Sequence, residues 1–202
     1  MRYVLASDSP RRIDLLSIFN LDLSSVSHSF DEEQIGKDID PKDYCEIISK
    51  GKASSISKAY DDAVIIAADT IVVVGDKILG KPNNESEAIK MLELLSDRTH
   101  KVITGVTLLC NCKKVDFSFS EQTTVVFNKI HLNEIKYYVE KYKPLDKSGS
   151  YGIQGYSSIF VKSISGCFFN VVGLPLSLLF HHLKRLELIQ FPLNTNNRIN
   201  KL

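Results

Sequence analysis

Long apolar runs are missing from this 202-residue chain. Because a membrane-spanning helix needs about 20 consecutive apolar residues, we expect no membrane span and no membrane partner. The apolar stretch at residues 3–6 is also too short to form the core of a signal peptide. These absences predict a cytoplasmic protein.

Cysteine is scarce, and neither sign of charge is in excess. Cys110 and Cys112 have neither a second pair nor the spacing of a zinc site, so we expect reduced, packed thiols without a metal or redox role. The 25 lysines and arginines balance 24 aspartates and glutamates, which argues against a nucleic-acid partner. Any anion-binding site must therefore be built locally.

Internal repeats and low-complexity linkers are also absent. The length and the hydrophobic fraction of 44% favour a single domain, which we place at residues 1–190, before a polar tail at 191–202. Hydrophobic periodicity and turn residues predict the boundaries of the elements. We expect strands at residues 3–6, 21–29, 63–74, 77–80, 101–110, 115–130, 159–164 and 168–172, and helices at 10–19, 41–59, 84–95, 133–142 and 175–188.

The first strand runs directly into a helix that carries Arg11 and Arg12 in its first turn. Ser9 fits the N-cap and Pro10 the first helical position, so free backbone N–H groups, the positive end of the helix dipole and two guanidinium groups converge. This arrangement suits a phosphorylated ligand, because a guanidinium group can bind two phosphate oxygens at once. A well-capped helix with two solvated arginines is an equal alternative.

One acidic residue, Asp69, interrupts the apolar run at residues 63–74. A carboxylate inside a buried strand is costly unless it is paired, bound to a metal or directed into a cleft. The alternative is a buried aspartate that caps a neighbouring loop. Lys52 and Lys58 lie in the preceding helix, where most lysines are simply solvated.

Residues 75–81 have the spacing of a Walker phosphate-binding loop, but Pro82 stands where such a loop needs a hydroxyl group for magnesium. Pro82 also disfavours the helical backbone that should begin at Lys81. We therefore exclude a P-loop kinase and keep Lys81 as a candidate phosphate ligand by another route.

Eight short motifs, read together, resemble those of the Maf-like nucleotide pyrophosphatases, over residues 2–186 and in the same order. They lie at residues 5–12, 31–32, 52–53, 68–70, 80–82, 104–106, 146–155 and 170–175. The resemblance implies a two-lobed α/β fold, similar to the inosine triphosphate pyrophosphatases, with a long mixed, twisted sheet, flanking helices and a deep central cleft. It also implies a homodimer that hydrolyses nucleoside triphosphates to the monophosphate and pyrophosphate with a divalent metal, Mg²⁺ or Mn²⁺.

The resemblance also assigns roles by position. Arg11, Thr70 and Gln154 are similar to the residues that set specificity in the branch acting on dTTP and UTP, and Asp69 is the implied proton acceptor. Gln154 carries both an amide donor and an acceptor, as reading a pyrimidine edge requires.

Cleavage of the triphosphate requires further groups. We expect Glu32 and Asp69 to hold the metal through hard oxygen ligands, with Lys52 and Lys81 completing the catalytic set. The groups expected to bind the triphosphate are Ser7, Arg11, Arg12, Lys52 and Lys81.

A regulatory protein is the rival interpretation, because the family has also been linked to inhibition of septum formation. Such a protein would bind nucleotide or the division machinery without turnover. It would not need a carboxylate inside a strand beside a phosphate-binding cluster. We therefore favour an enzyme with a housekeeping role in the nucleotide pool.

Overall fold

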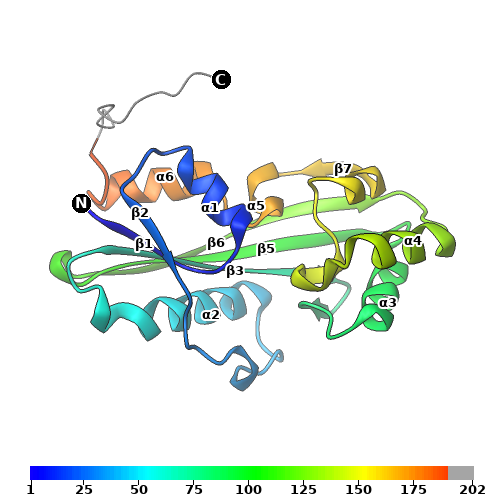
Figure 1. The fold of residues 1–202 in the computed structure, drawn as a ribbon, viewed down its shortest axis with the longest axis horizontal. Helices are drawn as coiled ribbons and strands as arrows, with labels where there is room; N and C mark the ends of the chain where they lie inside the picture. Colours follow the sequence, from blue (N-terminus) through cyan, green and yellow to red (C-terminus); the bar gives the residue numbers. More distant parts are fainter. Residues whose placement is uncertain (191–202) are drawn as a thin grey trace.

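A computed structural model describes residues 1–190, and the predicted polar tail lies outside the described residues. One mixed sheet of seven strands has the order β2-β1-β3-β5-β6-β7, with β4 paired to β3 (Figure 1). The strands are β1 (Tyr3–Ala6), β2 (Leu23–Val26), β3 (Val64–Val74), β4 (Lys77–Leu79), β5 (Thr99–Cys110), β6 (Val115–Phe127) and β7 (Val161–Ser165). The α-helices are α1 (Pro10–Ser17), α2 (Pro41–Ile56), α3 (Glu85–Leu95), α4 (Leu132–Tyr142), α5 (Phe168–Val172) and α6 (Leu176–Arg185). The expected α/β class with a long mixed sheet is confirmed, and a domain boundary at residue 190 stays a prediction.

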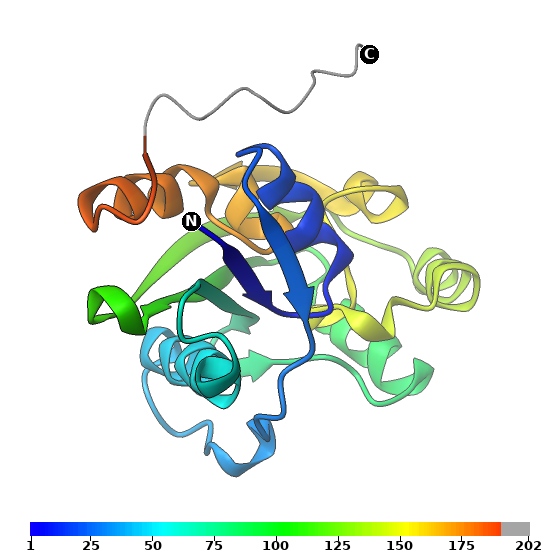
Figure 2. The same cartoon turned by 60° about the vertical axis from the view of Figure 1, so that its left-hand side comes forward.

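Helices cover both faces of the sheet. The helix α2 packs against β3 and β5 on one face, whereas α1, α5 and α6 lie on the other (Figure 1). Figure 2 shows the same two layers from the side, with β1 and β2 next to each other. Across residues 1–190, every helix is too short or too polar to cross a bilayer.

The apolar run around Asp69 forms β3, which is buried along its length except at the half-buried Thr70. One edge of β3 pairs with β5 in antiparallel register from Ile65 to Val73. On the other edge, within the described chain, β1 pairs only with residues 64–66 and β4 only with residues 72–74. The sheet therefore has a gap beside residues 67–71.

Two glycines let α2 and the loop before it approach the sheet closely. A Cβ atom on Gly105 of β5 would lie 2.4 Å from the backbone carbon of Cys45, so no side chain fits between β5 and α2. A Cβ atom on Gly51 would lie 2.4 Å from the ring of Phe30. Gly51 thus leaves room for the segment that leads to Glu32, and α2 continues through it.

One predicted strand is wrong, because residues 168–172 form the helix α5. A segment of five residues, four of them apolar, has no resolvable period, so the sequence does not distinguish a strand from a helical turn. Gly173 ends the helix at a φ of 127°, and the side-chain amide of Asn170 donates to the Val102 carbonyl oxygen at 3.0 Å. This bond ties α5 to β5.

The buried His100 makes stability depend on pH. Its Nε2 lies 2.7 Å from the Tyr151 hydroxyl, and burial lowers the pKa of His100 to about 4. In the unfolded chain the pKa is about 6.5, so the stability contributed by neutral His100 is complete above that pH and is lost as the pH falls towards 4. Between pH 7 and pH 5 we expect the free energy of unfolding to fall by about 2 kcal/mol more in the wild type than in the variant His100→Gln. Urea unfolding at both pH values measures this, and equal pH dependence in the two proteins would contradict it.

Candidate active site

A cavity of about 770 Å³ opens at the gap in the sheet. Its walls come from the β1–α1 turn, α2, β3, the segment after β4, the loop at residues 146–155 and the end of α5. The structure brings all nine predicted site residues to this cavity, and their individual roles stay predictions. They are Ser7, Arg11, Arg12, Glu32, Lys52, Asp69, Thr70, Lys81 and Gln154.

The gap lets two faces of the sheet share the cavity. Asp69 and Thr70 are consecutive in β3, so their side chains leave on opposite faces. Asp69 contacts Lys52 of α2, whereas Thr70 contacts Arg12 of α1. Because no strand covers this edge of β3 in the described chain, a single ligand at the edge can reach both faces.

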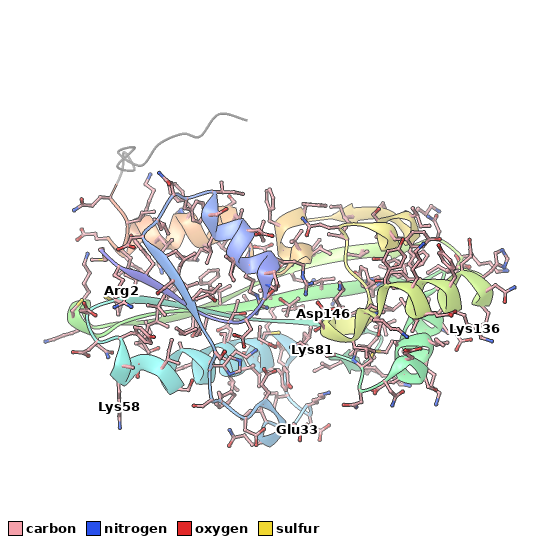
Figure 3. The ribbon with its side chains drawn as sticks, in the orientation of Figure 1. Arg2, Glu33, Lys58, Lys81, Lys136 and Asp146 are labelled. Carbon is pink, nitrogen blue, oxygen red and sulfur yellow. The ribbon has the colours of Figure 1, made fainter. Side chains whose placement is uncertain are left out.

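On the α2 face, Lys52 joins two carboxylates. Its Nζ lies 2.7 Å from Asp69 Oδ1 and 2.9 Å from Glu32 Oε1, and only 4% of the residue is exposed. Lys52 is thus not one of the solvated lysines of a helix, whereas Lys58, just beyond the end of α2, is exposed (Figure 3). Oδ2 of Asp69 has no hydrogen-bond partner in residues 1–190, so it stays free to accept a proton.

The same two carboxylates fit a divalent cation in part. Asp69 and Glu32 provide hard oxygen ligands, which Mg²⁺ and Mn²⁺ prefer. Within residues 1–190 no group of three His, Cys, Asp or Glu side chains is placed to hold a metal. The protein therefore offers an incomplete set of ligands, as is usual for Mg²⁺ that is held jointly with substrate phosphates.

On the α1 face, Arg12 is held by neutral groups. Its Nε donates to the Gly173 carbonyl oxygen at 3.0 Å, Nη1 to Ser7 Oγ at 3.2 Å and Nη2 to Thr70 Oγ1 at 3.1 Å. Thr70 Oγ1 also lies 2.9 Å from Thr104 Oγ1. Burial lowers the pKa of Arg12, and the charge of Asp69 opposes this effect.

The cations that line the cavity differ in whether a carboxylate neutralises them. Asp146 pairs with Arg11 at 2.9 Å and with Lys147 at 2.7 Å. Partial burial acts to raise the pKa of Asp146, but the bonds from Lys147 and Arg11 outweigh it and lower that pKa. Three further cations have no carboxylate at ion-pair distance in the part of the chain that the structure describes. They are Arg12, Lys37 and Lys81.

Sequence reasoning missed several residues of this cavity, among them Asp146, Lys147, Lys37 and His28. Asp146 and Lys147 lie in one of the quoted motifs, where a charged pair directly before a glycine-rich loop is a signal that was available. Lys37 lies in a polar loop and gave no signal. His28, whose Nε2 lies 3.8 Å from Glu32 Oε1, also gave none.

The start of α1 and the β3–β4 hairpin were both predicted from local sequence. Ser9 and Pro10 do begin α1 as the N-cap and the first helical residue, but the Ser9 side chain makes no capping bond. Instead, Ser7 Oγ accepts a hydrogen bond from the Ser9 backbone N–H at 3.2 Å. Residues 75–79 form the turn and second strand of the β3–β4 hairpin, with Gly75 at a φ of 55°, in agreement with the exclusion of a Walker loop.

Lys81 and Asp146 lie near the middle of the molecule, between the helix layers (Figure 3). The buried lysine–carboxylate cluster and the unneutralised cations define an α/β protein with a cavity lined by charged residues. Sequence comparison gives the family. A family model described as "Maf-like protein" matches residues 2–186, and the chain belongs to the Maf-like family.

Curated relatives cover most of the chain. A protein of Clostridium botulinum (strain Alaska E43 / Type E3), named dTTP/UTP pyrophosphatase, is 46% identical over 178 residues, which are 88% of this chain and 95% of the relative. A protein of the same name from Bacillus cytotoxicus is 42% identical over 186 residues, 92% of this chain and 96% of the relative. Among solved structures, the chain is similar to the Ham1 protein of Staphylococcus aureus, with 14% identity, 80% of each chain covered and a TM-score of 0.47.

Replacement of Lys52 by methionine should destabilise the protein. Asp69 and Glu32 would then face each other without the ammonium group that separates them. Removal of one partner from a buried ion pair costs about 3–5 kcal/mol, and since Glu32 is partly exposed we expect a loss of about 2–4 kcal/mol at neutral pH. Urea unfolding measures it.

The matched control is Lys58→Met, which removes an exposed lysine that lies close to the end of the same helix. This variant should stay within about 0.5 kcal/mol of the wild type. Equal losses in the two variants would show that Lys52 does not hold the two carboxylates together.

Proposed function

We propose that this protein is a nucleoside triphosphate pyrophosphatase that hydrolyses dTTP and UTP to the monophosphate and pyrophosphate. The observation that carries this proposal is one cavity in which the Lys52–Asp69–Glu32 cluster faces cations without carboxylate partners. The names of the relatives at 42–46% identity support the same activity and the pyrimidine preference.

Binding of the triphosphate falls first to the unneutralised cations. Arg12 is already fixed by three hydrogen bonds to neutral acceptors, so its charge meets a phosphate group without rearrangement. Lys81, which follows β4, lines the same cavity and can bind the same chain of phosphates. The start of α1 adds backbone donors to this grip.

Asp69 then acts as the proton acceptor for the attacking water. Its Oδ1 is held by Lys52, which fixes the carboxylate and leaves Oδ2 to take the proton. Asp69 and Glu32 are the residues that would hold Mg²⁺ or Mn²⁺. When bound, such a cation supplies positive charge against the negative charge that develops on the phosphate oxygens.

Base selection falls to residues at the rim of the cavity. Gln154 is exposed, and its amide has no hydrogen-bond partner in the described residues, so both its donor and its acceptor are available to a pyrimidine. The hydroxyl of Thr70 is already shared between Arg12 and Thr104. Thr70 therefore holds Arg12 in place, and its part in specificity rests on the resemblance alone.

The proposal also includes a cytoplasmic location, a homodimer and turnover of the nucleotide. Cys45, Cys110, Cys112 and Cys167 are free, as a cytoplasmic location requires. The homodimer rests on the resemblance alone. A regulatory protein that only binds nucleotide would have no use for a carboxylate whose second oxygen is left open beside the cations, so we prefer turnover to binding alone.

A panel of nucleotides tests the proposed activity. Purified protein is incubated with magnesium and dTTP, UTP, CTP, ATP, GTP or 7-methyl-GTP, and pyrophosphate and orthophosphate are measured separately. We expect pyrophosphate as the product and the highest kcat/KM for dTTP and UTP, because Gln154 can match a pyrimidine edge. Orthophosphate alone would mean that a different bond is cleaved, and a higher kcat/KM for any purine nucleotide would refute the specificity.

The variant Asp69→Asn tests the role of the acid. Because an amide cannot take the proton from water, we expect kcat to fall by roughly 10²- to 10⁴-fold. Lys52 keeps its contact with Glu32, so the circular dichroism spectrum should be unchanged. The matched control Asp76→Asn, in the exposed β3–β4 turn, should keep full activity. Near-normal kcat in Asp69→Asn would remove Asp69 from the mechanism.

A further inference from the structure

The loop at residues 146–155 lies against the unpaired edge of β3. The Gly149 backbone N–H donates to the Gly80 carbonyl oxygen at 3.0 Å. Gly149 has a φ of 66°, and a Cβ atom there would lie 2.9 Å from Cγ2 of Val72. A residue with a side chain would therefore hold the loop away from the strand, and glycine lets it close.

One side chain attaches this loop to the gap itself. Ser148 Oγ donates a hydrogen bond to the backbone carbonyl oxygen of Thr70 at 2.6 Å. Thr70 lies inside residues 67–71, where no strand of the described chain pairs with this edge of β3. The serine hydroxyl thus takes the place of the backbone N–H that a neighbouring strand would supply, and it satisfies a carbonyl group that burial would otherwise leave costly.

The strand and the loop that this hydrogen bond joins differ in how firmly they are held. The strand β3 is fixed by its pairing with β5 on both sides of Thr70, from Ile65 to Val73. The loop has no such ladder. The Gly149 bond to Gly80 and the Asp146–Arg11 pair hold its start, and after Ser148 the buried Ser150 and Tyr151 contact Met91 and His100. Loss of the Ser148 hydroxyl therefore loosens residues 146–149 and leaves Tyr151 and Asp69 in place.

We propose that Ser148 is a positioning residue, whose hydroxyl holds residues 146–149 against β3 and so keeps Lys147 at the wall of the cavity. This inference rests on the proposed function, because Lys147 matters only if a nucleotide occupies the cavity. Ser148 itself need not touch the nucleotide. The loop acts on affinity, and the chemistry stays with β3 and α2.

The test is Ser148→Ala. Loss of one neutral hydrogen bond corresponds to roughly a fivefold change in an equilibrium, so we expect KM for dTTP to rise about fivefold while kcat stays within about twofold. Amide hydrogen exchange at residues 147–149 should become faster, with exchange in β3 and at Tyr151 unchanged. Ser148→Thr keeps the hydroxyl and should restore both KM and the slow exchange.

The matched control is Ser158→Ala. Ser158 Oγ also donates to a backbone carbonyl, that of Gly155, at 2.7 Å, but it is exposed and does not line the cavity. This variant should keep the wild-type KM. An unchanged KM in Ser148→Ala, or a fall in kcat without a change in KM, would overturn the positioning role.

The failure of this inference can be separated from failure of the proposed function. If the wild type binds dTTP in calorimetry but releases no pyrophosphate, the activity is wrong, and weaker binding by Ser148→Ala together with faster loop exchange still supports the positioning role. If the wild type is active and Ser148→Ala is indistinguishable from it, only the positioning role is wrong. If the wild type neither binds nor hydrolyses nucleotides, both are wrong.

Discussion

The site depends on an interruption of strand pairing along one edge of β3. The parallel strand β1 ends at Ala6, where the chain turns into α1, and β4 joins the same edge only at Val72. A longer β1 would complete the ladder and separate the two faces of the sheet. Because the ladder stops, Lys52 on the α2 face and Arg12 on the α1 face line one cavity, although β3 is otherwise a buried central strand. The pairing of β3 with β5 keeps the strand rigid, and the gap on its other edge opens the strand to the cavity.

The distribution of charge in the cavity separates binding from chemistry. A buried ion pair is weak evidence for stability, since well-packed apolar residues of similar volume often do as well or better. The Lys52–Asp69–Glu32 cluster is therefore better explained by what it does with a ligand. Its lysine is fully engaged by two carboxylates and fixes them, whereas the cations without acidic partners in the described residues are the ones that the proposed function assigns to the phosphates. The overall charge of the chain, 25 basic against 24 acidic residues, gives no hint of this local arrangement.

The parts of the site that the sequence predicts are those with a local cause. Asp69 stands out because burial of a charge is costly wherever the strand lies, and Arg11 and Arg12 stand out because a helix start is visible in a few residues. The choice between Lys52 and Lys58 has no local signal, since both lie on or just beyond α2 and only the packing of that helix on β5 directs Lys52 to Asp69. The partner of Arg11 lies 135 residues away, and the helix α5 replaces a predicted strand because Asn170 bonds to β5. These features are set by tertiary packing, and no pattern within one segment contains them.

The two adjacent arginines illustrate what this packing adds. Arg12 donates only to neutral oxygens, so a phosphate group can use its charge while the three existing bonds stay in place. Arg11 is paired with Asp146 and must give up that partner, wholly or in part, when a phosphate binds. Both side chains of this pair are partly exposed, and exposed pairs contribute only about 0–1 kcal/mol, so the exchange costs little. On the proposed function, Arg12 would set the geometry of the bound phosphates, whereas Arg11 would couple their arrival to the loop that Asp146 begins. The part of the cavity around Arg12 is thus arranged before a ligand binds. The part around Arg11 would adjust when the ligand binds.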